Sequence, residues 1–210
     1  MNDESPPLGP TAARRAAQAE STRASLVAAA RKLFVNKGFD ATSTEEIVAA
    51  AEVGTRGALY HHFADKRALF EAVVLDIEQE LLATMAAEFA AADSIAALDL
   101  LRREIHAFLD ACLGRDVQRI LLIDGRAVLG WQRWREIESR HGITAMRSLL
   151  DRAVAEHAMA PDAPTDAIAH MLLAALDEAT LYIAAADGTA DAHDNALRAM
   201  NTILDGLERR

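Results

Sequence analysis

The sequence predicts an all-α fold, and composition and residue spacing both support this class. Ala, Leu, Glu and Arg are abundant, whereas the 210 residues include only five prolines and ten glycines, a balance that favours helices over strands. Apolar residues recur every three or four positions, and we find no convincing alternation with the period of a strand. The length exceeds that of a typical single domain, so we expect a large helical domain with a smaller one attached.

The first 19 residues carry three of the five prolines and show no apolar periodicity. We therefore expect residues 1–19 to form a disordered N-terminal arm. The first helix should begin near Ser21 or Thr22 and end at Gly38, a residue favoured just past a helix C-terminus. Its buried stripe is predicted to comprise Leu26, Ala30, Leu33 and Phe34.

Residues 43–67, with the sequence STEEIVAAAEVGTRGALYHHFADKR, predict two short helices joined by a tight turn. Ser43 is suited to cap the first helix, and Glu46, three residues later, completes a capping box. Gly54 gives the turn its backbone freedom, and Thr55 caps the second helix. Two short helices about such a turn form a helix-turn-helix.

The second helix presents polar donors suited to a nucleic acid. Leu59 and Phe63 lie four residues apart and should anchor one face of this helix. A glycine inside a helix costs about 1 kcal/mol relative to alanine, so Gly57 indicates close approach of the backbone to another surface, such as a duplex groove. We therefore predict a three-helix DNA-binding domain over residues 20–64. The donors that point away from the anchored face are Thr55, Arg56, Tyr60 and His61.

The charge distribution agrees with DNA contact at the N-terminal end. The net charge is −10, which argues against a protein that coats nucleic acid through bulk charge. Residues 1–70 hold nine Lys or Arg against eight Asp or Glu, whereas residues 71–210 hold thirteen against twenty-four. Acidity away from the predicted DNA-binding end would repel phosphate and favour one docking orientation.

Three segments, AARKLFVNKGF, STEEIVAAAEV and GALYHHFADKRALF, together resemble the N-terminal domain of the tetracycline-repressor (TetR) family of transcription regulators. The resemblance spans roughly residues 22–71, and its aromatic–His–Phe ending is specific. One departure concerns the turn. The family pattern leads us to expect glycine directly after Ala51, where this chain has Glu52, Val53 and Gly54. A turn one residue longer would shift the assignment of base contacts by one position.

The resemblance and the residue types together assign the DNA contacts. Tyr60 and Lys66 are predicted to contact phosphate, Tyr60 through its hydroxyl and Lys66 through its ammonium near a helix N-terminus; the alternative is a packing role for Tyr60 and solvation for Lys66. Thr55 and Arg56 are the predicted base readers, since arginine pairs bidentately with guanine. His61 would reach phosphate or base. Ser43 and Thr44 either cap their helix only or also contact phosphate.

The remaining residues, 65–210, predict a larger helical domain for ligand binding and dimerisation. Asp65 should cap a long helix that links the two domains. Its apolar stripe is Phe70, Val74, Ile77, Leu81, Met85 and Phe89. Further helices are expected from Asp93 or Ser94 to Leu113, in short pieces between 116 and 141, and over 143–157, 165–186 and 188–207.

The helix expected over Thr165–Ala186 is apolar on nearly all sides, so it requires cover on several faces. We therefore predict a homodimer in which the last two helices form a four-helix bundle with their copies, as the resemblance also implies. Such a dimer would bind a near-palindromic double-stranded DNA operator with half-sites about 34 to 36 Å apart, or a multiple of that distance. The family further implies a repressor that is released by a small-molecule effector bound in the C-terminal domain.

Polar and aromatic residues within the apolar stripes supply candidates for the effector pocket, although such residues more often belong to a core. Asp177 and Glu178 are two carboxylates amid apolar residues, which either face solvent at the dimer seam or are buried against a cation such as Arg126 or the ligand. The full candidate set is His106, Phe108, Trp131, Trp134, Met146, Met171, Asp177, Glu178 and Tyr182.

Other classes of function find less support in the sequence. No nucleophile motif or Gly-rich phosphate loop is present. Neither the pair Glu138 and His141 nor the pair His61 and His62 has a third ligand at a metal-binding spacing. We therefore expect no enzyme, no cofactor and no metal; a helical adaptor that binds protein rather than DNA is the alternative.

Cys112 is the only cysteine, which excludes an intramolecular disulfide and fits a reducing cytoplasm. Its place on an apolar stripe indicates a core role, with redox sensing as the alternative. The acidic N-terminus has no hydrophobic region, so we expect no signal peptide. Asp177 and Glu178 interrupt the longest apolar segment, which we expect to fall well short of a membrane span. These features predict a cytoplasmic protein.

Overall fold

The structure, a computed structural model, describes residues 9–88, 94–138, 142–186 and 189–209. Every regular element in these residues is a helix, which confirms the predicted all-α class. The chain divides into two compact units, Met1–Val73 and Val74–Arg210. This division falls inside the fourth helix, whereas the predicted domain boundary at residue 65 falls just before that helix begins.

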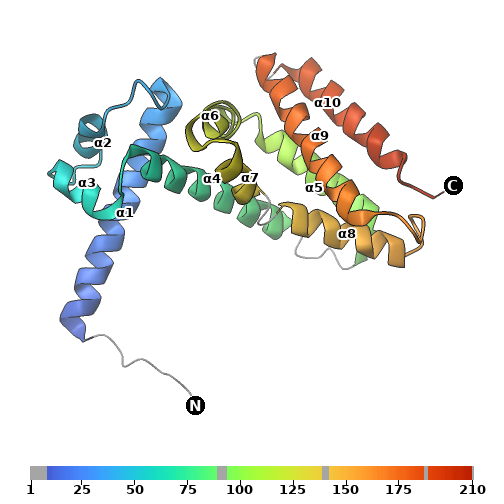
Figure 1. Cartoon of the computed structure of the whole chain (residues 1–210), viewed down its shortest axis with the longest axis horizontal. Helices are drawn as coiled ribbons and strands as arrows, with labels where there is room; N and C mark the ends of the chain where they lie inside the picture. The colour runs from blue at the N-terminus through green and yellow to red at the C-terminus, as the bar shows by residue number, and fades with distance from the viewer. Residues whose placement is uncertain (1–8, 89–93, 139–141, 187–188, 210) are drawn as a thin grey trace. The chain divides into compact units, whose positions relative to one another are not determined.

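The N-terminal unit contains α1 (Pro10–Lys37), α2 (Thr44–Ala50), α3 (Arg56–His62) and the start of α4 (Lys66–Glu88) (Figure 1). The prediction that the first helix begins near Ser21 was wrong. Pro10 occupies the first helical position, where the missing N–H costs no hydrogen bond, and the alanine-rich residues that follow continue the helix. The rest of the predicted arm, residues 1–8, lies outside the described residues.

Three phenylalanine rings form the centre of the N-terminal unit. The ring centroids of Phe34, Phe39 and Phe70 lie 5.3 to 5.6 Å from one another, in the range of favourable aromatic pairs. Phe34 comes from α1, Phe39 from the loop after it and Phe70 from α4. The trio therefore packs α1 and α4 together around the loop that leads into α2.

Local hydrogen bonds fix the ends of the short helices as predicted. The Ser43 hydroxyl accepts from the backbone N–H of Glu46, and the Glu46 carboxylate accepts from that of Ser43, at 3.2 and 3.0 Å. Lys37 pairs with the same carboxylate, and these contacts lower the pKa of Glu46 to about 2. The Thr55 hydroxyl accepts from the N–H of Ala58 at 3.4 Å and caps α3. The predicted capping box and α3 cap are therefore both present.

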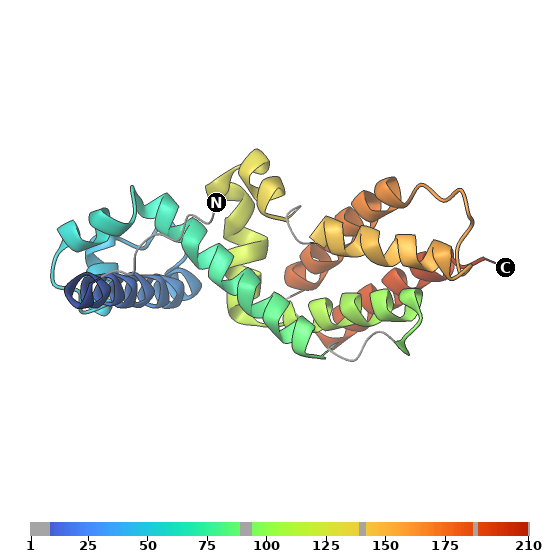
Figure 2. The same ribbon diagram turned by 90° about the horizontal axis from the view of Figure 1, so that it is seen from below.

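The C-terminal unit holds the rest of α4 and a set of packed helices (Figures 1 and 2). They are α5 (Ala97–Ala111), η2 (Val117–Asp124), α6 (Gly125–Leu129), α7 (Trp131–Glu138), α8 (Thr144–Ala155), α9 (Thr165–Ala185) and α10 (Ala190–Asp205). The short elements predicted between 116 and 141 are present, and η2 is a π-helix, a rare form that is frequent at functional sites. Four predicted residues lie outside the described residues or side chains, namely Met85, Phe89, Asp93 and Gly188.

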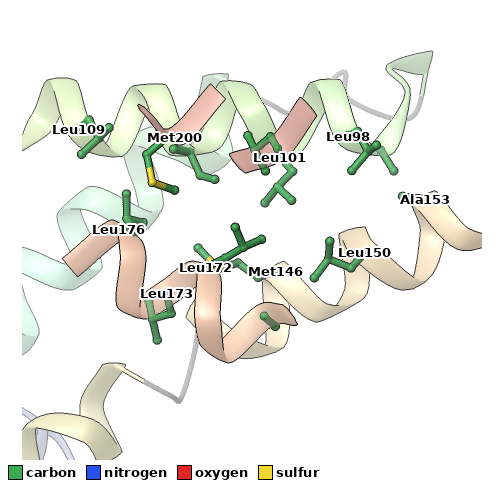
Figure 3. Close-up of a cluster of buried hydrophobic side chains, with 14 of the residues drawn as sticks. Leu98, Leu101, Leu109, Met146, Leu150, Ala153, Leu172, Leu173, Leu176 and Met200 are labelled. Carbon is green, nitrogen blue, oxygen red and sulfur yellow. The ribbon is translucent and has the colours of Figure 1, made fainter. Parts of the chain in front are cut away.

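The core of the C-terminal unit lies among α5, α8, α9 and α10. Figure 3 shows Leu98, Leu101 and Leu109 of α5 opposite side chains of the other helices. The labelled partners are Met146, Leu150 and Ala153 of α8, Leu172, Leu173 and Leu176 of α9, and Met200 of α10. These side chains are buried and form one continuous core of the C-terminal unit.

One helix of this core, α9, is long and apolar enough to cross a membrane by length and composition alone. The expectation that Asp177 and Glu178 leave this segment well short of a span was therefore wrong, because two charges are too few to change the average. The buried side chains of Leu172 and Leu176 belong to the core cluster. One face of α9 is therefore packed in the core, while a third of its apolar window is buried in all.

Candidate functional site

The predicted DNA-contact residues of α3 are exposed, while the predicted anchors of the same helix are buried. Leu59 is fully buried and Phe63 nearly so, which confirms the predicted anchored face. Seven of the predicted contact residues lie at the ends of α2 and on α3, and all are exposed except the half-buried Thr44: Ser43, Thr44, Thr55, Arg56, Gly57, Tyr60 and His61.

Arg56 is held in place by neighbours on two helices. Its Nη1 lies 2.6 Å from Oε1 of Glu45, a residue in the first turn of α2, and its guanidinium carbon lies 6.0 Å from the centroid of the Tyr60 ring. Hydrogen bonding from Arg56, and then from Thr44, lowers the pKa of Tyr60. Because these side chains are exposed, the ion pair contributes little to stability and leaves the guanidinium able to exchange partners.

Glu45 was not predicted to belong to this surface. Hydrogen bonding to the backbone and to Thr44, together with the charge of Arg56, lowers the pKa of Glu45, so the carboxylate is ionised at neutral pH. A fixed negative charge beside a base reader repels phosphate and accepts from a base amino group. No local sequence pattern predicts the pair of Glu45 and Arg56, because the two residues come from different helices.

The turn between α2 and α3 contains two residues with left-handed backbone, Glu52 at φ 56° and Gly54 at φ 86°. Gly54 adopts this conformation without steric cost, as predicted, whereas a residue with a Cβ loses about 1 to 2 kcal/mol there. Position 52, where the resemblance leads us to expect glycine, thus has a left-handed backbone. This chain keeps the same backbone form with Glu52.

Lys66 makes intramolecular contacts that were not predicted. Its Nζ donates to the backbone carbonyl oxygens of Phe39 and Thr42, at 2.8 and 2.9 Å, and lies 4.2 Å from the centroid of the Phe39 ring. These bonds occupy two of the three N–H donors of the ammonium. Lys66 is therefore neither simply solvated nor dedicated to phosphate, and phosphate contact through the third donor stays a prediction.

No contact within the described residues requires a glycine at position 57. A Cβ placed on it would meet only the Thr55 hydroxyl oxygen, at an ordinary contact distance of 3.5 Å. The predicted reason, close approach of the backbone to an external surface, stays a prediction.

The C-terminal unit contains a partly open cavity of about 320 Å³, a size within the range of small-molecule sites. Its walls come from α4, α5, η2, α7, α8 and α9. The lining residues are Glu78, Leu81, Leu82, Leu101, Glu104, Ile105, Phe108, Leu121, Leu122, Trp134, Ile137, Gly142, Ala145, Met146, Leu173, Leu176 and Asp177.

Four of the predicted pocket residues line this cavity, namely Phe108, Trp134, Met146 and Asp177. The other five do not. His106 is turned toward α10, where its Nε2 lies 2.8 Å from Oδ1 of Asn201. Trp131 is 62 % exposed, and the guanidinium groups of Arg126 and Arg135 lie over its ring.

The remaining three excluded candidates lie on the outer side of α9. Met171 is 71 % and Tyr182 49 % exposed, and Glu178 is exposed as well. Adjacent residues of a helix point in directions about 100° apart, so Asp177 lines the cavity while Glu178 does not. This finding corrects the assignment of these three residues to the pocket.

Asp177 forms the ion pair that was one of the predicted alternatives. Its Oδ2 lies 2.7 Å from Nη2 of Arg126, and both side chains are partly buried. The pair supplies each charge with a counter-charge inside an apolar region, as partly buried charges require.

Trp134 forms a tightly packed part of the cavity wall. The residue is only 5 % exposed, and its ring lies so close to the backbone of Gly125 that a Cβ added there would be 2.4 Å from Cζ3. Its buried Nε1 makes no hydrogen bond within the described part of the chain. The cavity wall therefore contains an indole donor without an acceptor.

Glu104 of α5 also lines the cavity. Burial raises the pKa of its carboxyl group, and the charge of Arg152 opposes that shift only in part. Glu104 was not among the predicted pocket residues, because an acidic residue between apolar positions of a helix usually faces solvent.

No group of three His, Cys, Asp or Glu side chains converges as a metal site among the described residues. The candidate ligands Glu138 and His141 lie outside the described side chains. His61 and His62 are neighbours, with ring centroids 5.3 Å apart.

Comparison with known proteins decides the family. The family model described as "Tetracyclin repressor-like, C-terminal domain" matches residues 98–207, more than half of the chain. The model described as "Bacterial regulatory proteins, tetR family" matches residues 26–73. The chain belongs to the TetR family. This TetR-family protein is accordingly a DNA-binding transcriptional regulator, with a helix-turn-helix domain followed by a larger helical domain as the sequence predicted.

Individual TetR-family relatives agree with this conclusion. A TetR-family transcriptional regulator of Pectobacterium atrosepticum, known from a crystal structure, is 34 % identical and superposes with a TM-score of 0.79, covering 92 % of this chain and 97 % of that one. The TetC protein of transposon Tn10 in Escherichia coli is 29 % identical over 66 % of this chain and 68 % of its own. The transcriptional repressor BepR of Brucella suis is 32 % identical, and the match spans about half of each protein.

Proposed function

We propose that this TetR-family protein is a repressor that binds a near-palindromic operator as a homodimer and leaves it when a small molecule fills the cavity. The supporting observation is α4. This uninterrupted helix supplies Lys66 and Phe70 to the N-terminal unit and Glu78, Leu81 and Leu82 to the cavity wall. A ligand that displaces the cavity end of α4 therefore acts on a helix whose first residues belong to the DNA-binding unit.

For DNA recognition, we assign base reading to Arg56 and Thr55 and phosphate contact to Tyr60 and Lys66. Arg56 is exposed and held near its position by Glu45, so it is pre-positioned for a guanine edge. His61 is exposed at the end of α3, where it would reach phosphate or base. Two further phosphate contacts are assigned to the amide end of α2, at Ser43 and Thr44.

For assembly, we assign the dimer interface to α9 and α10. Met171 and Tyr182 of α9 and Ile203 of α10 are large apolar side chains exposed in the single chain. A second copy packed against these helices would cover them, as in a two-fold four-helix bundle. Such a dimer carries two α3 helices and needs half-sites about 34 to 36 Å apart, or a multiple of that distance. We place it in the cytoplasm, where the single buried Cys112 stays reduced.

For induction, the effector must bind the DNA-incompetent form of the dimer more tightly than the DNA-competent form, because equal affinity for both forms shifts neither. The apolar cavity gives such a ligand a binding site, and repression then follows from occlusion of the promoter.

The test begins with footprinting of the purified protein on DNA upstream of its own gene at low salt. We expect a protected near-palindrome, and then a ligand that abolishes the protection. Arg56→Ala should relax sequence preference by about 1 to 3 kcal/mol at one base pair, whereas Lys66→Ala should weaken binding to all sequences and lower the salt slope. Identical footprints for the two variants would refute this division of roles. Absence of sequence preference on any duplex would favour the protein-binding adaptor instead, and a monomer in light scattering at micromolar concentration would refute the dimer.

A further inference from the structure

We propose that the cavity of the C-terminal unit selects an amphipathic cation, a molecule with an apolar body and one ammonium-type group. The proposal rests on the proposed function, in which this cavity is the effector site, and it names the chemical class of the effector.

The charged residues that line the cavity in the described part of the chain all have the same sign. The wall is mainly apolar, and its ionisable members among the described residues are the carboxylates Glu78, Glu104 and Asp177. Carboxylates in an apolar wall attract a positive group strongly because the local dielectric is low. They repel an anion for the same reason, while a neutral ligand gains nothing from their charge. The wall therefore favours a cation with an apolar body.

The three carboxylates differ in what already balances them. Asp177 pairs with Arg126 at 2.7 Å. Glu104 is half-buried, burial raises its pKa, and the charge of Arg152 acts on it without an ion pair between the two in the described part of the chain. A partly buried carboxylate without a close counter-ion is costly. A ligand cation beside Glu104 would remove that cost, so we assign Glu104 as the main selecting charge.

Trp134 places an aromatic ring in the same wall as Glu104. The indole is the aromatic ring that attracts cations best. The wall therefore combines a carboxylate with an aromatic ring, two kinds of group that attract a cation.

The direct test measures binding to the full chain without DNA. The probes are three apolar bodies, phenylbutyl, naphthylmethyl and octyl, each carrying a trimethylammonium group, its neutral tert-butyl isostere or a carboxylate. Binding is followed by calorimetry and by tryptophan emission, since Trp134 lines the cavity. We expect at least one trimethylammonium probe to bind at least tenfold more tightly than its isostere and its carboxylate. Equal or tighter binding of the isosteres or carboxylates, or no binding of any cation, would overturn the proposal.

A matched pair of variants locates the selecting charge. Glu104→Gln should weaken cation binding at least tenfold and leave the neutral isostere unaffected. Glu178→Gln removes an exposed carboxylate from α9 outside the cavity and should change neither affinity. Equal losses for cation and isostere in Glu104→Gln would show a purely structural role for Glu104 and contradict the assignment.

Different results would contradict the proposed ligand response and the cation selectivity of the cavity. If a cation binds as expected but no cation changes operator binding, the proposed ligand response fails while the cavity's selectivity stands. If an anionic or neutral compound releases the operator and no cation binds, the proposed function stands and the cation selectivity is refuted.

Discussion

Replacement of Gly125 by alanine should destabilise the C-terminal unit, although the same change in most helices is stabilising. The new Cβ would lie 2.4 Å from Cζ3 and 2.9 Å from Cε3 of Trp134, and 3.0 Å from the carbonyl oxygen of Ile120. Carbon atoms in contact sit about 3.5 to 4.0 Å apart, so the ring must retreat by about 1 Å. Overpacking of this kind costs about 1 to 3 kcal/mol, against a helix-propensity gain of about 1 kcal/mol. We expect a net loss of up to about 2 kcal/mol.

The assay is denaturant unfolding followed by tryptophan emission, with Gly142→Ala as the control. Gly142 also lines the cavity, but a Cβ there would meet Leu173 Cδ1 at 3.6 Å, an ordinary contact. This control should stay within about 0.5 kcal/mol of the parent or become more stable. In a Trp134→Leu background the Gly125→Ala penalty should largely vanish, because the clashing ring is gone. The reasoning is refuted if Gly125→Ala matches the control, or if its penalty persists without the ring.

Three further predictions concern single side chains. Lys66→Met removes two charge-assisted hydrogen bonds to backbone carbonyls and should lower the stability of the N-terminal unit by about 1.5 to 3 kcal/mol; a thermal-melt shift no larger than that of Lys32→Met, which changes an exposed residue of α1, would contradict this. Burial raises the pKa of the Cys112 thiol to about 12 from an ordinary value of 9.0. Native protein should therefore react with a thiol reagent about a thousandfold more slowly than unfolded protein. Rapid labelling of the native protein would instead support redox sensing. Because burial raises the folded-state pKa of Glu104, its ionisation costs stability as pH rises from about 4.3 through that pKa. Glu104→Gln should therefore melt higher than the parent at neutral pH, with a gap that closes on acidification; a pH-independent gap would show another cause.

The sequence was sufficient for the helix-turn-helix because its signals are local. The capping box at Ser43, the cap at Thr55 and the anchor at Leu59 each depend on residues within one helical turn, and all three are present. The contacts of Glu45 with Arg56 and of Lys66 with the loop before α2 join segments that are distant in sequence. Their geometry depends on how the helices pack, which periodicity does not encode.

The cavity was predicted less well for a related physical reason. A helix that is apolar on nearly all sides, such as α9, does not reveal which face lines a cavity and which faces outward. Asp177 and Glu178 were therefore indistinguishable in sequence, and Met171 was assigned to the wrong side. The start of α1 was predicted too late because the prediction relied on an apolar stripe. Residues 10–19 have strong helix propensity but no such stripe.

The π-helix η2 makes the structure of the cavity wall depend on the number of residues in this segment. Its hydrogen bonds run from residue i to i+5, which accommodates more residues per turn than an α-helix, and it supplies Leu121 and Leu122 to the wall. Deletion of one residue within η2 would allow ordinary α-helical pairing, and every later side chain of the segment would then rotate by about 100°. Gly125 would no longer lie beneath Trp134. Single-residue insertions and deletions in this segment should therefore be tolerated far less well than conservative substitutions.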